Sequence, residues 1–165
     1  MMKSKNISFT FSEYESLEEI DPCDRELVLS ARKAAENAYA PYSHFKVGAA
    51  VRLESGVVVS GSNVENAAFP SGICAERNAL ANASSNHPGD KPVALAIMAA
   101  TSSGLTEDTV SPCGNCRQVI AEEEIRNGNK IRVILGSRKK IRIIESAGDL
   151  LPLQFNRNDL ELTLH

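Results

Sequence analysis

The sequence of 165 residues contains no apolar run long enough to cross a membrane. Its longest such run, Val93 to Ala100, has eight residues, whereas a membrane-spanning helix needs about 20. Residues 1–16 contain no apolar signal core, so the sequence predicts no secretion signal. We therefore expect a cytoplasmic protein that has no membrane partner.

A surplus of positive charge is also missing. The 18 lysine and arginine residues are outnumbered by 21 acidic residues, which gives a formal net charge of −3. Such a chain lacks the field that draws a protein onto a phosphate backbone, so we expect no nucleic-acid polymer as a partner. The four cysteines are too few for a disulfide scaffold, and their spacing is therefore more informative than their number.

The length is typical of a single domain, at about 150 residues per domain. We find no internal repeat, low-complexity tract or linker in the sequence. Residues 1–20 are polar, with a weak apolar alternation at Ile7, Phe9 and Phe11. The sequence thus predicts an N-terminal arm over 1–20, either loose or added to a sheet as a strand, followed by one domain over 21–165.

Periodicity predicts alternating helices and strands after the arm. The segment Asp21-Pro22-Cys23-Asp24 is typical of a helix start, because it combines a capping side chain, proline at the first position and an acidic first turn. The predicted elements are a helix from 21 that Pro41 stops, a hairpin of strands at 45–53 and 57–62, a helix at 74–83, a strand at 93–100 covered on both faces, a helix at 113–126, strands at 131–135 and 140–144, and a brief helix at 146–151. This order indicates a mixed sheet with helices on its faces.

Three of the cysteines form two clusters that could hold a metal ion. Cys113 and Cys116 are three residues apart at a predicted helix start, so they share a face. Cys74 lies 39 residues before Cys113, at the start of another predicted helix. Helix starts offer amides and a positive dipole end, which favour thiolates. If the two starts meet, three thiolates surround one ion and leave a fourth position open, which is the arrangement of a catalytic zinc site.

Other interpretations of these cysteines stay open at this point. A Cys-x-x-Cys pair also occurs in thiol redox proteins and in structural zinc sites, where Cys23, His44 or His87 could supply a fourth ligand. Cys23 has no partner at metal spacing, which favours a small buried or idle thiol. Neither alternative needs Glu76, two residues after Cys74, whereas a carboxylate beside a metal-bound water is what a hydrolytic proton shuttle requires.

The two clusters resemble the zinc-dependent cytidine deaminase family. The resemblance is carried by Cys-Ala-Glu-Arg at 74–77 and by Ser-Pro-Cys-Gly-Asn-Cys-Arg-Gln at 111–118, and it extends to segments 40–50, 61–67 and 150–155. Zinc deaminases share a metal ligand two residues before a catalytic glutamate, followed by Pro-Cys-x-x-Cys. With cysteine as the first ligand, the site is similar to that of the small deaminases of free nucleosides, which form homotetramers.

The resemblance implies an α/β fold, a three-layer α/β/α sandwich around a mixed five-stranded sheet. It also implies one Zn²⁺ per chain and the hydrolysis of cytidine and 2′-deoxycytidine to uridine and 2′-deoxyuridine with release of ammonia, as in pyrimidine salvage. A zinc-bound hydroxide would attack C4 of the pyrimidine, with Glu76 as the proton shuttle. The alternatives are a deaminase of a modified nucleoside, of the blasticidin-S type, and a non-catalytic structural zinc module.

The resemblance assigns the zinc ligands to Cys74, Cys113 and Cys116 and catalysis to Glu76. Three thiolates on a divalent ion leave a net charge of −1, which opposes the ionisation of a bound water. Arg77 resembles the family arginine that relieves this charge by hydrogen bonding to ligand cysteines. For Arg117, a structural role is the simpler interpretation.

The substrate contacts are implied in the same way. Phe45 would pack on the pyrimidine, the backbone of Ala75 would contact its polar edge, and Asn63 with Glu65 would bind the ribose hydroxyls. Phe155 would reach the pocket of a neighbouring subunit, so the site would be complete only in the oligomer. Two more aromatic residues are placed at the pocket rim or at a subunit contact: Tyr42 and Phe69.

Overall fold

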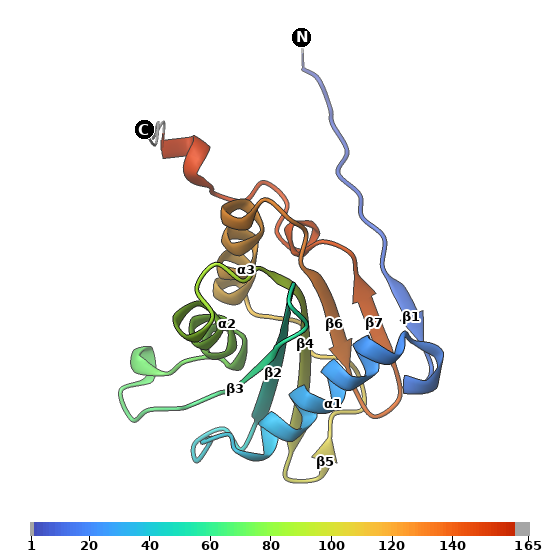
Figure 1. Cartoon of the computed structure of the whole chain (residues 1–165), viewed down its shortest axis with the longest axis vertical. Coiled ribbons are helices and arrows are strands. Elements are labelled where there is room, and N and C mark those ends of the chain that lie inside the picture. Colours follow the sequence, from blue (N-terminus) through green and yellow to red (C-terminus); the bar gives the residue numbers. More distant parts are fainter. Residues whose placement is uncertain (1, 161–165) are drawn as a thin grey trace.

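The computed structural model describes residues 2–160 and contains a seven-stranded sheet with helices on both faces (Figure 1). Residue 1 of the predicted arm (1–20) and residues 161–165 of the predicted domain (21–165) lie outside the described residues. The strands are β1 (Ser12–Tyr14), β2 (Lys46–Leu53), β3 (Val58–Ser62), β4 (Pro92–Thr101), β5 (Gly104–Leu105), β6 (Arg132–Gly136) and β7 (Ile141–Ile144). The α-helices are α1 (Pro22–Glu36), α2 (Ala75–Asn86) and α3 (Gly114–Asn127), and short 3-10 helices include η2 (Phe69–Ser71) and η3 (Ala147–Leu150).

The strand order is β1-β7-β6-β4-β2-β3, with β5 paired to β4. Strands β4 and β6 are parallel and the other pairs are antiparallel, so the sheet is mixed, as predicted. The five predicted strands correspond to the five longer strands of the sheet, which are β2, β3, β4, β6 and β7. The other two, β1 and β5, pair over three and two residues respectively, which is too short for a periodic pattern to be visible in a sequence.

Helix α1 covers one face of the sheet and helices α2 and α3 cover the other, which confirms the three-layer sandwich (Figure 1). Strand β4 shows why both faces are covered. Its Leu95 and Ile97 belong to the core under α2 and α3, while Ala96 and Met98 belong to the core under α1. Because successive side chains point to opposite faces, an uninterrupted apolar run fits only a strand with two cores.

Helix α1 begins as predicted, with the Asp21 carboxylate accepting a hydrogen bond from the Cys23 amide at 2.8 Å. It ends at Glu36, earlier than the predicted stop at Pro41. The last turn tightens there, because the amides of the next two residues donate to the carbonyls of Ala34 and Ala35, three residues back. None of the helices in residues 2–160 is both long and apolar enough to cross a membrane.

Two glycines let the helices lie directly on the sheet. A Cβ at Gly48 in β2 would be 2.1 Å from the carbonyl oxygen of Ala31 in α1. A Cβ at Gly61 in β3 would be 2.4 Å from the backbone nitrogen of Ala79 in α2. Since neither backbone can yield without moving its helix, these glycines set the distance between the sheet and the helices on its two faces.

We expect Gly61→Ala to lower the free energy of unfolding by about 1–3 kcal/mol, the usual cost of overpacking a close contact. Urea unfolding of the zinc-loaded protein measures this change. Ser60→Ala is the matched control, because Ser60 is an exposed neighbour on the same strand, and it should stay within about 0.5 kcal/mol of the parent. Equal stability of Gly61→Ala and Ser60→Ala would show that α2 can shift without cost.

Candidate active site

Three sulfur atoms meet where helices α2 and α3 begin. Cys74 is the N-cap residue of α2, Cys113 is the N-cap residue of α3, and Cys116 lies in the first turn of α3. The three Sγ atoms lie within 4.8 Å of one another, and those of Cys74 and Cys113 are 4.0 Å apart. A tetrahedral zinc ion with Zn–S bonds of about 2.3 Å separates its sulfurs by roughly 3.8 Å, so the cluster fits one zinc ion per chain.

The cluster is a three-ligand centre. Within residues 2–160, no further histidine, cysteine or carboxylate joins the group. Cys23, His44 and His87, the possible fourth ligands of a structural site, lie outside it, and Cys23 is an exposed free thiol at the start of α1. Three sulfur ligands leave one position of a tetrahedral ion open, which favours a catalytic site over a closed structural one.

Burial and crowding control the protonation of the thiols. Burial raises the pKa of Cys116 far above its ordinary value, and the nearby charges of Glu76 and Cys74 add to the increase. Burial is also the largest cause of the raised pKa of Cys74. For Cys113, burial alone would raise the pKa, but hydrogen bonds from the Cys116 and Asn115 amides and the other thiols lower it on balance. A divalent cation would relieve the repulsion among three thiolates, so metal binding here releases protons.

Glu76 is the buried carboxyl of this site. Its residue is only 5% exposed and lies in the first turn of α2, two residues after Cys74. Burial is the main cause of its raised pKa, which a hydrogen bond involving the Cys116 thiol partly offsets. Residues i and i+2 of a helix do not normally face each other, but Cys74 stands just before the helix, and so both reach the same place. Ala75, between them, is fully buried.

The two arginines differ in their contacts. Among the described residues, no hydrogen bond joins the Arg77 guanidinium to a cysteine, so its charge-relieving role stays a prediction. Arg117 instead makes two backbone contacts, donating from Nε to the Pro112 carbonyl and from a terminal nitrogen to the Leu150 carbonyl, each at 2.9 Å. Arg117 thus braces the residue before Cys113 against η3, which is a structural role, as the sequence suggested, with partners that the sequence pattern does not reveal.

A cavity of about 530 Å³ opens beside Cys74. This volume lies within the usual range for small-molecule sites. The walls come from the loop between α1 and β2, from the segment between β3 and α2 that includes η2, and from the residue that caps α2: Tyr42, Ser43, Asn63, Val64, Glu65, Asn66, Phe69, Gly72, Ile73 and Cys74. The predicted sugar-binding pair, Asn63 and Glu65, therefore shares a cavity with Cys74 of the cysteine cluster. Tyr42 and Phe69 also line it, with their rings edge to face at 5.7 Å.

The side chains of Asn63 and Glu65 also support the loop that carries Phe45. Asn63 accepts from the Val47 amide at 2.7 Å and donates to the Phe45 carbonyl at 3.0 Å. The Glu65 carboxylate accepts from the Tyr42 and Ser43 amides and from the Ser43 hydroxyl. The Ser43 hydroxyl is the largest cause of the lowered pKa of Glu65. Sequence reasoning assigned no role to Ser43, because its bonds arise only when two loops meet.

Phe155 lies outside this cavity and is 58% exposed. Its backbone carbonyl accepts a hydrogen bond of 2.8 Å from the Gln118 side chain, which attaches the C-terminal tail to the first turns of α3. The structure describes a single chain, so a contact between Phe155 and a neighbouring subunit stays a prediction.

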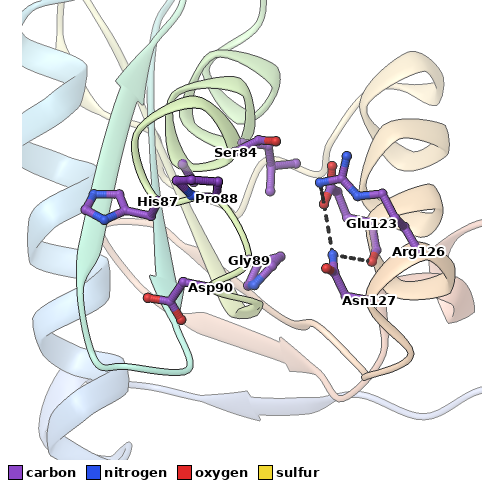
Figure 2. Close-up of a pocket in the computed structure, with 11 residues that line it drawn as sticks. Ser84, His87, Pro88, Gly89, Asp90, Glu123, Arg126 and Asn127 are labelled. Carbon is purple, nitrogen blue, oxygen red and sulfur yellow. Dashed lines mark hydrogen bonds and ion pairs between the residues drawn. The ribbon is translucent and has the colours of Figure 1, made fainter.

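A second cavity of about 220 Å³ lies at the opposite ends of α2 and α3 (Figure 2). Its polar groups largely satisfy one another, since Glu123 pairs with Arg126 at 2.7 Å and accepts from Asn127 (Figure 2). No cysteine lines this cavity. The reactive groups are therefore gathered at the starts of the two helices and not at their ends.

Comparison with known proteins agrees with this geometry. Residues 21–129 match the family model described as the cytidine and deoxycytidylate deaminase zinc-binding region. The chain is 42% identical over 134 residues to a cytidine deaminase of Sporosarcina psychrophila, covering 81% of this chain and 92% of that protein. It is 39% identical over 143 residues to a cytidine deaminase of Halalkalibacterium halodurans, with 83% and 98% covered. The crystal structure of cytidine deaminase from Burkholderia pseudomallei matches with a TM-score of 0.69 at 41% identity, over 79% of this chain and 97% of that one.

The brace formed by Arg117 makes a prediction about metal retention. Arg117→Lys keeps the charge but cannot make both hydrogen bonds, so we expect zinc to pass to a chromophoric chelator about tenfold faster, as is typical when support of a ligand is lost. Arg126→Lys, in the last turn of the same helix, is the control and should release zinc at the parent rate. Identical release from the two variants would rule out this role for Arg117.

Proposed function

This chain belongs to the cytidine and deoxycytidylate deaminase family, and we propose that it hydrolyses cytidine and 2′-deoxycytidine to uridine and 2′-deoxyuridine with release of ammonia. The observation that carries the proposal is the buried Glu76 carboxyl beside three cysteines that leave a metal position open. The relatives at 39–42% identity are themselves named cytidine deaminases.

Cys74, Cys113 and Cys116 would hold the zinc ion. When bound, zinc supplies Lewis-acid activation of the water that replaces the amino group at C4. Glu76 would accept one proton of the attacking water and deliver it to the ring nitrogen N3, and would then pass the second proton of that water to the amino group, which leaves as ammonia. One carboxyl would serve as base and then as acid, and it lies buried in the first turn of α2, next to the cluster.

Two of the proposed substrate contacts line the cavity beside Cys74, whereas Phe45 and Ala75 are not among its lining residues and are proposed from the family resemblance. Asn63 and Glu65 line it and would bind the ribose hydroxyls. Phe45, held by Asn63 through its carbonyl, would pack on the pyrimidine, and the backbone of Ala75 would contact the polar edge of the ring. We also propose that Arg77 relieves the negative charge of the ligand sulfurs.

The assembly and setting are further parts of the proposal. We propose a homotetramer in which Phe155 enters the pocket of a neighbouring subunit, supported by its exposed ring and by the attachment of the tail to α3. The domain would span 21–165, preceded by an arm over 1–20 that contains β1. Pyrimidine salvage in the cytoplasm is the setting that a deaminase of free nucleosides would serve.

The function is tested by ammonia release from cytidine, 2′-deoxycytidine, cytosine, CMP and blasticidin S. We expect turnover of the first two and none of cytosine, because cytosine leaves the ribose-binding groups without partners. Glu76→Gln should keep one zinc ion per chain yet lose on the order of 10²–10⁴ in rate. Preference for blasticidin S would support the modified-nucleoside alternative, and zinc without any turnover would support a structural module.

The role of the tail is tested by Phe155→Ala. We expect KM for cytidine to rise by about 10- to 100-fold, since a buried Phe side chain is worth roughly 1.5–3 kcal/mol. Asn158→Ala is the control, because Asn158 is an exposed polar residue on the same tail. Size-exclusion chromatography should show a tetramer in each case. Normal kinetics of Phe155→Ala would leave Phe155 outside the pocket.

A further inference from the structure

Phe45 has both of its polar backbone groups bound by residues of the loops that line the cavity. Its amide donates to the Ser43 hydroxyl oxygen at 3.1 Å, and its carbonyl accepts from the Asn63 side chain at 3.0 Å. The Ser43 hydroxyl in turn donates to Glu65. A chain of hydrogen bonds therefore leads from the carboxylate on the sugar side of the proposed site to the aromatic residue on the base side.

The turn between Ser43 and Phe45 needs this support. His44 has a φ of 55°, in the left-handed region that non-glycine residues rarely adopt. Its own amide is bound to the Ala40 carbonyl at 3.1 Å, and the amides of Tyr42 and Ser43 are bound to Glu65. Such a conformation persists only where the surroundings hold it on both sides. Ser43 provides the link on the Phe45 side.

Glu65 keeps little capacity for other partners. An ionised carboxylate offers about four acceptor positions, and the amides of Tyr42 and Ser43 with the Ser43 hydroxyl occupy three of them. One position remains for a hydroxyl from outside. The carboxylate can thus meet a ligand without releasing the turn.

We propose that Ser43 is a positioning residue that holds Phe45 against the pyrimidine, so that base recognition depends on the carboxylate of the sugar side. This inference rests on the proposed function. The role of Ser43 can be distinguished from that of Glu65. Loss of a sugar contact would weaken the binding of nucleosides alone, whereas a displaced Phe45 would also weaken the binding of the free base.

The structure contains a matched control for Ser43. At the turn between β2 and β3, Ser55 donates through its hydroxyl to Asp90 and accepts from the Val57 amide, as Ser43 does with Glu65 and Phe45. Ser55, Val57 and Asp90 are not among the residues that line the cavity beside Cys74. Ser55→Ala therefore removes the same kind of bonds at a place that has no contact with a ligand there.

The test measures KM and kcat for cytidine and the inhibition constant of cytosine in the zinc-loaded enzyme. We expect Ser43→Ala to raise KM and the cytosine inhibition constant about tenfold each, with kcat changed less than about twofold. Ser43→Thr, which keeps the hydroxyl, should restore both values, and Ser55→Ala should change neither. In a Phe45→Ala background, Ser43→Ala should have much less effect, because the residue it positions is gone.

Hydrogen exchange of backbone amides supplies a readout that does not depend on activity. Ser43→Ala should speed exchange over residues 42–47 and Ser55→Ala only around residue 57. Two results for Ser43→Ala would overturn this role of Ser43. One is an unchanged exchange rate over residues 42–47, and the other is a raised KM for cytidine with an unchanged inhibition constant of cytosine. If the parent protein deaminates neither cytidine nor 2′-deoxycytidine, the proposed function is wrong. Hydrogen exchange would still decide whether Ser43 holds Phe45 in place.

Discussion

The meeting of two helix N-termini is the constraint on which the rest of this protein depends. Helices α2 and α3 lie on the same face of the sheet, and their N-cap residues are Cys74 and Cys113, whose sulfurs are 4.0 Å apart. Unpaired amides and the positive dipole ends at this point favour negative charge, yet burial raises the pKa of Cys74 and Cys116. Three sulfurs gathered at one point can share a divalent cation, and the Glu76 carboxyl lies beside them in the first turn of α2.

The hydrogen bonds around the cavity show a second form of organisation. Glu65 and Asn63 bind backbone groups of the loop that precedes β2, and they do so without exhausting their own capacity. Residues that would recognise a ligand are thus also the residues that give the pocket its shape. The order of the pocket then exists before any ligand arrives, which lowers the entropy that binding must overcome.

Sequence patterns predicted the helices and strands because these depend on local spacing, whereas the resemblance to zinc deaminases is what placed Cys74 and Cys113, 39 residues apart, in one site. The apolar run in β4 indicated a strand between two cores, and the three-residue spacing of Cys113 and Cys116 indicated a shared face. The short strand β5, the brace of Arg117 on Leu150 and the bond between Ser43 and Glu65 were not predictable in this way. Each of them depends on which distant segments meet, and no local period records such a meeting.

The close contact at Gly61 links strand β3 to the helix that begins at the cysteine cluster. Only a glycine at that position lets the carbonyl of Ala75 and the amide of Ala79 lie this close to β3, and Ala75 stands between Cys74 and Glu76, the residues proposed to bind zinc and to carry the proton. Mutational tolerance in this enzyme should therefore follow the support of helix α2 as much as the walls of the pocket. A strand residue with no side chain at all belongs among the least replaceable positions of the protein.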